Sequence, residues 1–210
     1  MVSRRYGWWG IAFAVLLLLY GGMGSIPTAE DPSAEIVAYY DAHAWLVVIA
    51  QLVSVLAVLA LAVFGLGLAR EAPDGTTRRN LVVAVVLVVI TELATNVPPL
   101  VLALVPTPSE SAAHAWTVVA DTTDVALFVA LGLLAAVVAV RGIPWLRWFG
   151  LVAAALCWVR AVATPLGFTT LDAVAPLAVL AFLTATSVWI VARRALWAQP
   201  DRTSSRERVA

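Results

Sequence analysis

Residues 44–69 read AWLVVIAQLVSVLAVLALAVFGLGLA, a run without a single charged side chain. A helix needs about 20 consecutive apolar residues to cross the hydrocarbon core of a bilayer, so this run is long enough to span it. The rest of the chain has a similar character, because 62% of its 210 residues are hydrophobic and only 12% are charged. Soluble domains carry about 25% charged residues. The sequence therefore predicts an all-α integral membrane protein.

Five further apolar runs predict a polytopic bundle of six transmembrane helices. Together with 44–69, the expected spans are residues 7–23, 81–105, 115–140, 145–165 and 171–193. We expect the first span to be retained rather than removed as a signal peptide, because Trp8 and Trp9 suit a membrane interface and no A-x-A-like cleavage site follows. Residues 1–198 are thus predicted to form one transmembrane domain, and the polar tail 199–210 to be disordered.

The distribution of charge predicts the orientation of these spans. Every cation is an arginine, and all but Arg160 fall in the tail or at alternate ends of the spans: Arg4, Arg5, Arg70, Arg78, Arg79, Arg141, Arg147, Arg193, Arg194, Arg202, Arg206 and Arg208. The opposite connections carry acidic residues instead: Glu30, Asp31, Glu35, Asp41 and Glu110. The positive-inside rule then places both termini in the cytoplasm, with the protein in a bacterial-type cytoplasmic membrane.

The long connection after the first span predicts a short amphipathic helix at residues 31–43 on the outer surface. Asp31 is a good N-cap and Pro32 suits the first helical position. The apolar side of this helix would comprise Ile36, Val37 and Tyr40. The stretch GSIPTAEDPSAEIVAYYDAHAWLVVIAQLV, residues 24–53, resembles small six-helix bacterial membrane proteins that form a family of unknown function. The resemblance implies the same topology and no particular activity.

Several ionisable residues lie inside the predicted spans, where a charge is costly and normally faces the bundle interior. They are Glu92, Asp121, Asp124 and Arg160, accompanied by the polar residues Gln51, Ser54 and Asn96. At 1.5 Å of rise per residue they converge in the outer half of the bilayer. We expect Glu92, Asp124 and Asp121 to act as acid and base, Arg160 to set their charge, and Asn96 and Gln51 to orient a ligand.

Two features sharpen this hypothesis. Pro98 and Pro99 are expected to kink the third span just above Glu92 and to open a cavity beside Glu92 and Asn96. One arginine cannot neutralise three carboxylates, so at least one of them is expected to hold a proton near neutral pH. Asp172, in TTLD, is interpreted instead as an acidic residue in the first turn of a helix capped by Thr169.

The chain lacks the residues and motifs that many enzymatic reactions require. Without lysine there is no Schiff base and no phosphate-loop lysine, and no G-x-S-x-G, H-E-x-x-H, C-x-x-C or phosphate-binding glycine loop occurs. His43 and His114 have no second ligand at metal-binding spacing, and Cys157 lies in an apolar run, where a thiol behaves as a small hydrophobe. No basic stripe suits nucleic acid. We therefore expect no metal and no cofactor.

Three functions stay open, and the sequence does not decide whether the protein is an enzyme. The first is a pocket for a hydrophobic small molecule, with acid and base catalysis of the kind that an isoprenoid isomerase or cyclase needs. The size and layout are similar to small membrane terpene cyclases, without a shared motif. The second is a proton-coupled transporter that works as a homo-oligomer. The third is a non-catalytic scaffold in which Arg160 and the carboxylates form a structural clamp. Membrane lipids are partners in every case.

Overall fold

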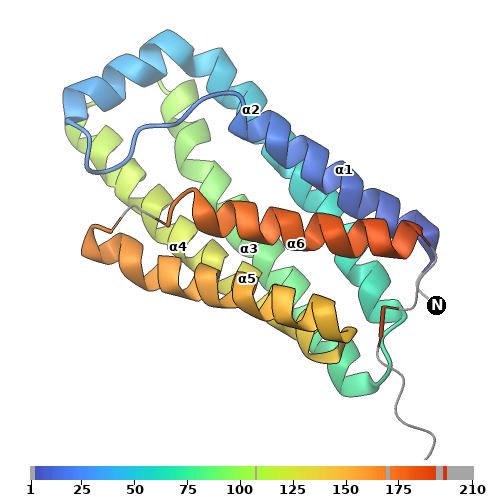
Figure 1. Cartoon of the computed structure of the whole chain (residues 1–210). Helices are drawn as coiled ribbons and strands as arrows, with labels where there is room; N and C mark the ends of the chain where they lie inside the picture. Colours follow the sequence, from blue (N-terminus) through green and yellow to red (C-terminus); the bar gives the residue numbers. More distant parts are fainter. Residues whose placement is uncertain (1–2, 107, 169–170, 193–195, 198–210) are drawn as a thin grey trace, which may run out of the picture.

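Six α-helices and one short 3-10 helix make up the part of the chain that the structure, a computed structural model, describes: residues 3–106, 108–168, 171–192 and 196–197 (Figure 1). The elements are α1 (Arg4–Gly21), α2 (Ser33–Arg70), α3 (Gly75–Leu104), α4 (Glu110–Arg141), α5 (Pro144–Ala163), η1 (Thr164–Leu166) and α6 (Val174–Val191). The only β-type pairing in these residues is an isolated bridge between Gly142 and Trp197. The predicted all-α class is therefore confirmed.

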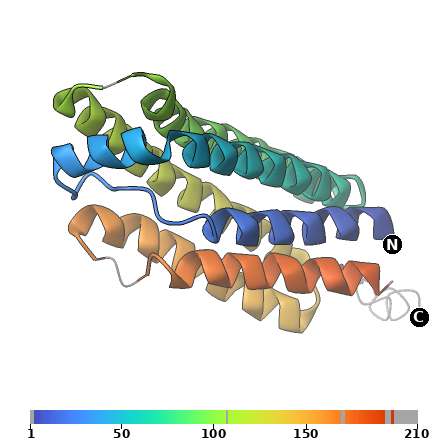
Figure 2. The ribbon, with the colours of Figure 1, turned by 90° about the horizontal axis from the view of Figure 1, so that it is seen from above.

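The helices form a closed ring. Each helix packs beside the next along the chain, and α6 returns to pack against α1 (Figures 1 and 2). Arg4 Nε donates to the carbonyl oxygen of Val191 at 2.6 Å, which joins the start of α1 to the end of α6. We call this end of the bundle the basic end, because its helix termini carry Arg4, Arg5, Arg70, Arg78, Arg79, Arg141 and Arg147. The opposite end is the acidic end.

Five of the helices are long and apolar enough to cross a membrane: α2, α3, α4, α5 with η1, and α6. Their outward sides expose large aliphatic residues, as in the stripe of Leu52, Leu56 and Leu59, which are each more than half exposed. Such a surface suits lipid rather than water. The chain is thus a multi-pass membrane protein. Among the described helices, α1 does not meet the same criterion, because its 18 residues begin with two arginines and include Trp8 and Trp9.

The predicted amphipathic segment is present, but it is the first part of α2 rather than a separate helix. His43 leaves the helical region of backbone angles (φ −123°, ψ 16°), so α2 kinks at the expected boundary between surface segment and span. Ile36 and Tyr40 are buried in a cluster with Leu102 of α3. The predicted cap is wrong: α2 begins at Ser33 without a side-chain cap, and Asp31 instead accepts hydrogen bonds from the backbone and hydroxyl of Thr28.

The third span contains the two prolines that were expected to kink it. α3 continues as one helix from Gly75 to Leu104 with Pro98 and Pro99 inside it, so they do not end the helix. Both prolines are buried, and α3 packs against α2 and α4. Neighbouring helices allow a membrane helix to tolerate the hydrogen bonds that proline removes.

Asp74 begins α3 at the basic end. Its carboxylate accepts hydrogen bonds from the backbone nitrogen of Thr77 at 2.7 Å and from the Thr77 hydroxyl at 2.8 Å. Such a cap satisfies a backbone donor that would otherwise have no partner in the first turn. These hydrogen bonds, with a smaller contribution from Arg141, hold the pKa of Asp74 below its ordinary value.

This cap predicts a pH-dependent effect of Asp74→Ala on stability. The folded-state pKa lies below the unfolded one, so the carboxylate stabilises the fold fully above the unfolded pKa of about 3.9 and loses this effect as pH falls through the folded pKa. The variant should therefore unfold at a lower temperature than the wild type at pH 7, and the gap should close in acid. Thermal unfolding of both proteins across this pH range is the measurement. A gap that persists unchanged at the lowest pH would contradict the assignment.

Candidate functional site

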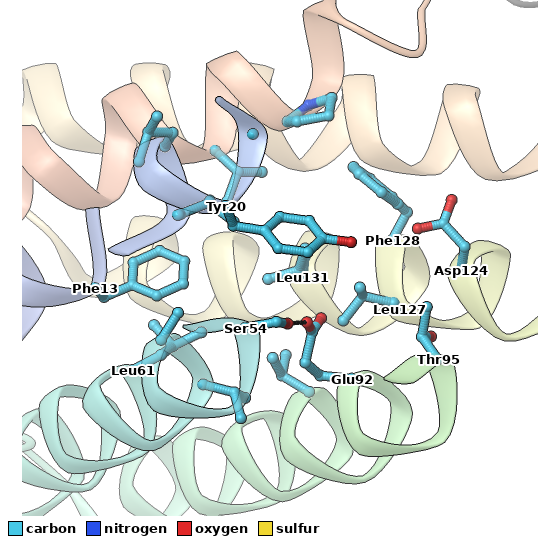
Figure 3. A pocket seen from close by; sticks show the side chains of 18 of the residues that line it. Phe13, Tyr20, Ser54, Leu61, Glu92, Thr95, Asp124, Leu127, Phe128 and Leu131 are labelled. Atoms are coloured by element: carbon cyan, nitrogen blue, oxygen red, sulfur yellow. Dashed lines mark hydrogen bonds between the residues drawn. The ribbon is translucent and has the colours of Figure 1, made fainter. Parts of the chain in front are cut away.

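A cavity of about 410 Å³ lies inside the bundle, and all six α-helices contribute to its wall (Figure 3). Most of the wall is aliphatic or aromatic, including Phe13 of α1, Leu61 of α2 and Leu131 of α4. The side chains that bring polar atoms to it are Tyr20, Ser54, Glu92, Thr95, Asp124 and Arg160. A largely apolar cavity with a few converging polar groups is the usual form of a small-molecule site.

The first polar group on this wall is Glu92 with its two neighbours. The Ser54 hydroxyl of α2 donates a hydrogen bond to Oε1 of Glu92, as the dashed line in Figure 3 shows. Asn96, one turn after Glu92, donates to the Glu92 carbonyl oxygen at 2.7 Å and to Ser54 Oγ at 3.4 Å. Ser54 and Asn96 are both buried; Ser54 holds the carboxyl directly, and Asn96 holds Ser54. No ion pair involves Glu92 in the part of the chain that the structure describes.

The second polar group is centred on Arg160 of α5. Its Nη1 lies 2.8 Å from Oδ2 of Asp124 on α4, and its Nε lies 3.0 Å from Oδ1 of Asp172, just before α6. The guanidinium also lies over the ring of Phe128, 3.8 Å from the centroid. The Arg160 side chain is only 10% exposed. The arginine thus joins α5 to α4 and to the connection that enters α6, and both of its ion pairs are with aspartates.

The structure brings three of the predicted site residues to one cavity: Glu92, Asp124 and Arg160. Asn96 is not on the cavity wall, and its side chain donates a hydrogen bond to the backbone carbonyl oxygen of Glu92. Asp121 is not part of the wall, and its carboxylate accepts a hydrogen bond from the backbone nitrogen of Ala29 at 2.9 Å, which fastens the connection between α1 and α2.

Gln51 also lies outside the wall. Its side chain is buried, and its amide nitrogen has no hydrogen-bond partner among the described residues. It comes one helical turn before Ser54 on α2. Its side chain nevertheless lies beside Tyr20, which is part of the wall, so the orienting role expected from sequence stays a prediction.

Two residues of the site were missed from sequence. Asp172 is an ion-pair partner of Arg160 and accepts a hydrogen bond from Thr164 at 3.3 Å, so treating it only as part of a helix start was wrong. Thr169, its expected capping partner, lies outside the described residues. Tyr20, in the last turn of α1, directs its ring into the cavity (Figure 3). Two features of the sequence could have identified them: Asp172 follows the membrane arginine Arg160 by twelve residues, and Tyr20 ends the first apolar run.

The cavity reaches the surface between α1 and α6. Nearer the basic end these helices are in close contact, because a Cβ atom added at Gly7 would lie 2.8 Å from the carbonyl oxygen of Ser187. Nearer the acidic end the cavity wall includes Leu18 of α1 and Leu177 of α6, which are each 59% exposed. The rim is therefore made of aliphatic side chains on the outer side of two neighbouring helices.

The described part of the chain contains no evident metal-binding site. No group of three or more histidine, cysteine, aspartate or glutamate side chains is arranged to hold an ion there. Cys157 is fully buried in the apolar core.

In comparisons with known proteins, no family model matches the sequence, and no similar protein is found among curated proteins or solved structures.

Proposed function

We propose that this membrane protein binds a lipophilic small molecule in the cavity and exchanges a proton with it through Glu92. The observation that carries the proposal is the cavity itself. Its volume of about 410 Å³ falls within the roughly 300–1,000 Å³ that small-molecule sites occupy. Its wall is mainly aliphatic and aromatic, with a carboxyl and an ion pair at separate points.

Access from the bilayer fits the same proposal. The rim at Leu18 and Leu177 is apolar and lies on the outside of the bundle. A molecule dissolved in the membrane can enter there without crossing water, provided that α1 lies in the bilayer beside α6. We therefore propose that α1 is the sixth span. The arginine distribution supports the further proposal that the basic end and both termini lie in the cytoplasm, with the protein in a bacterial-type cytoplasmic membrane.

Glu92 is the group best placed for acid and base chemistry. It faces the cavity, and Ser54, which also accepts a hydrogen bond from Asn96, can orient the carboxyl without neutralising its charge. Asp124 faces the same space but is paired with Arg160. Transfer of a proton from the Glu92 carboxyl to an alkene or epoxide would leave a carbocation and the Glu92 carboxylate, and return of a different proton from that cation to the carboxylate would complete the isomerisation or cyclisation of an isoprenoid-like molecule. That reaction class remains part of the proposal.

A structural clamp is the second candidate, and the contacts of Arg160 favour it. One side chain joins α4, α5 and the entry to α6 through two ion pairs and a ring contact. A scaffold protein would need this arrangement for stability alone. Glu92 has no part in it, so the two candidates assign different residues and can be separated by experiment.

The test of the proposed function is mass spectrometry of an organic extract from gently purified protein. We expect the wild type to retain a lipophile at about one molecule per chain, and Glu92→Gln to lose it or to hold a chemically altered form. Glu71→Gln is the matched control, because Glu71 is an exposed carboxylate at the basic end. Only bulk lipid in all three samples would favour the clamp.

A further inference from the structure

The charged groups at the cavity do not balance. Arg160 is the one cation on the cavity wall as described, and it already lies within 3.0 Å of two aspartates. Glu92 adds a third carboxyl to this region, with a hydroxyl and not a cation as its side-chain partner. If all three carboxyls are ionised, they exceed the arginine by two charges. A positive charge brought by a ligand would offset part of this excess.

Aromatic rings at the cavity point to the same kind of ligand. Phe13 and Tyr20 project their rings into the space from α1 (Figure 3). The face of an aromatic ring attracts a cation, and the attraction is stronger where water is excluded. The ring of Phe128 already holds the Arg160 guanidinium in this way. Tyr20 lies close enough to Glu92 for the two to interact, so its ring can contact a cation held at that carboxyl (Figure 3).

A ligand with a negatively charged head would meet no cation at the cavity that is not already offset by carboxylates. Arg160 already lies within 3.0 Å of two aspartates and over the ring of Phe128, so its single positive charge is offset and does not neutralise a further carboxylate or phosphate head. Such a head would also approach Glu92 and Asp124. Burial of an anion without a counter-charge is strongly unfavourable. Anionic lipophiles should therefore be rejected even though the rest of the cavity suits their hydrocarbon chains.

We infer that the cavity selects a lipophile with a positively charged head, such as an alkylammonium group, whose head lies at Glu92 and whose tail extends toward the opening between α1 and α6. This inference rests on the proposed lipophile pocket and on proton exchange at Glu92, and it names an amine, in place of a neutral alkene or epoxide, as the ligand of the same site. The ammonium group donates hydrogen bonds to Glu92, and its charge replaces the cation that Glu92 lacks. The aliphatic rim at Leu18 and Leu177 accommodates the hydrocarbon tail.

The test compares three probes that share one chain and differ in head charge: dodecylamine, dodecanol and dodecanoate at pH 7. Native mass spectrometry of the purified full chain in detergent measures the fraction with one molecule bound. We expect the amine to bind about tenfold more tightly than the alcohol, as a charge-assisted hydrogen bond implies, and the carboxylate to bind most weakly. Glu92→Gln should remove the advantage of the amine, whereas Glu71→Gln should retain it.

The outcomes separate this inference from the proposed function. If the alcohol or the carboxylate binds as tightly as the amine, the inference is overturned and the lipophile pocket stands. If no probe binds at one per chain, or if Ala57→Leu, which adds bulk to the cavity wall, leaves all binding unchanged, the proposed function itself fails. The comparison of heads uses the unaltered protein, so it holds even where a variant does not fold.

Discussion

Replacing Arg160 with leucine is expected to destabilise the folded protein by about 3 kcal/mol. The substitution leaves Asp124 and Asp172 without the counter-charge that now lies 2.8 and 3.0 Å away. Removing one partner of a buried ion pair costs about 3–5 kcal/mol. The low end applies because the two aspartate side chains are 31% and 37% exposed, so water partly compensates them. Reversible unfolding in mixed micelles measures the change.

Two further variants make this test specific. Arg147→Leu removes an exposed arginine at the basic end and should change stability little, which controls for the loss of one positive charge. Adding Asp124→Asn and Asp172→Asn to Arg160→Leu should restore much of the lost stability, because no uncompensated charge is left. Equal stability of the Arg160 and Arg147 variants would show that the Arg160 contacts contribute nothing to folding, and would count against the clamp.

Gly10→Ala is expected to cost about 1–3 kcal/mol, since it adds a methyl group where three helices meet. A Cβ atom at this position would overlap the Ser187 hydroxyl of α6 and would lie 3.0 Å from the ring of Phe64 on α2. The Ser187 hydroxyl donates to the Leu183 carbonyl oxygen at 2.6 Å, so moving it breaks a buried hydrogen bond. The contact between α1 and α6 at Gly10 should therefore loosen. Unfolding in mixed micelles again provides the measurement.

Gly21→Ala is the matched control in the same helix. No atom lies within 4 Å of a Cβ built at Gly21, so the added methyl group meets open space. The replacement should be neutral, or stabilising by up to about 1 kcal/mol through the better helix propensity of alanine. If both variants lose stability equally, close packing of α1 on α6 at Gly10 is not the cause.

The helical architecture was predictable because it depends on properties that each segment carries by itself. Apolar length predicted the five helices that can cross a membrane, and the amphipathic pattern predicted the buried side of the segment before His43. Helix ends were predicted less well. α3 begins at Gly75, well before its apolar run, because Asp74 caps a polar first turn. α2 begins at Ser33, because Asp31 bonds to Thr28 instead.

The site was predictable in part, for a reason that applies to all membrane bundles. A charge inside a span is costly unless it faces the interior, and this cost alone identified Glu92, Asp124 and Arg160, which do line one cavity. The cost of burying a charge does not identify the residue with which each charged side chain pairs. Arg160 pairs with Asp172, which follows α5 in a connection, and Asp121 bonds to Ala29 in another connection. Both contacts depend on how the connections lie over the helix ends.

Sequence by itself determined that this chain is a multi-pass helical membrane protein and which of its buried positions carry charge, because apolar length and the cost of burying a charge are local quantities. Tertiary structure alone decided the pairing of those charges, the cavity they share and the opening between α1 and α6. Ion pairs extend over only about 3 Å, so their partners depend on how the helices are rotated and displaced against one another. That arrangement is set by packing at places such as Gly10 and Ser187, which no local pattern specifies.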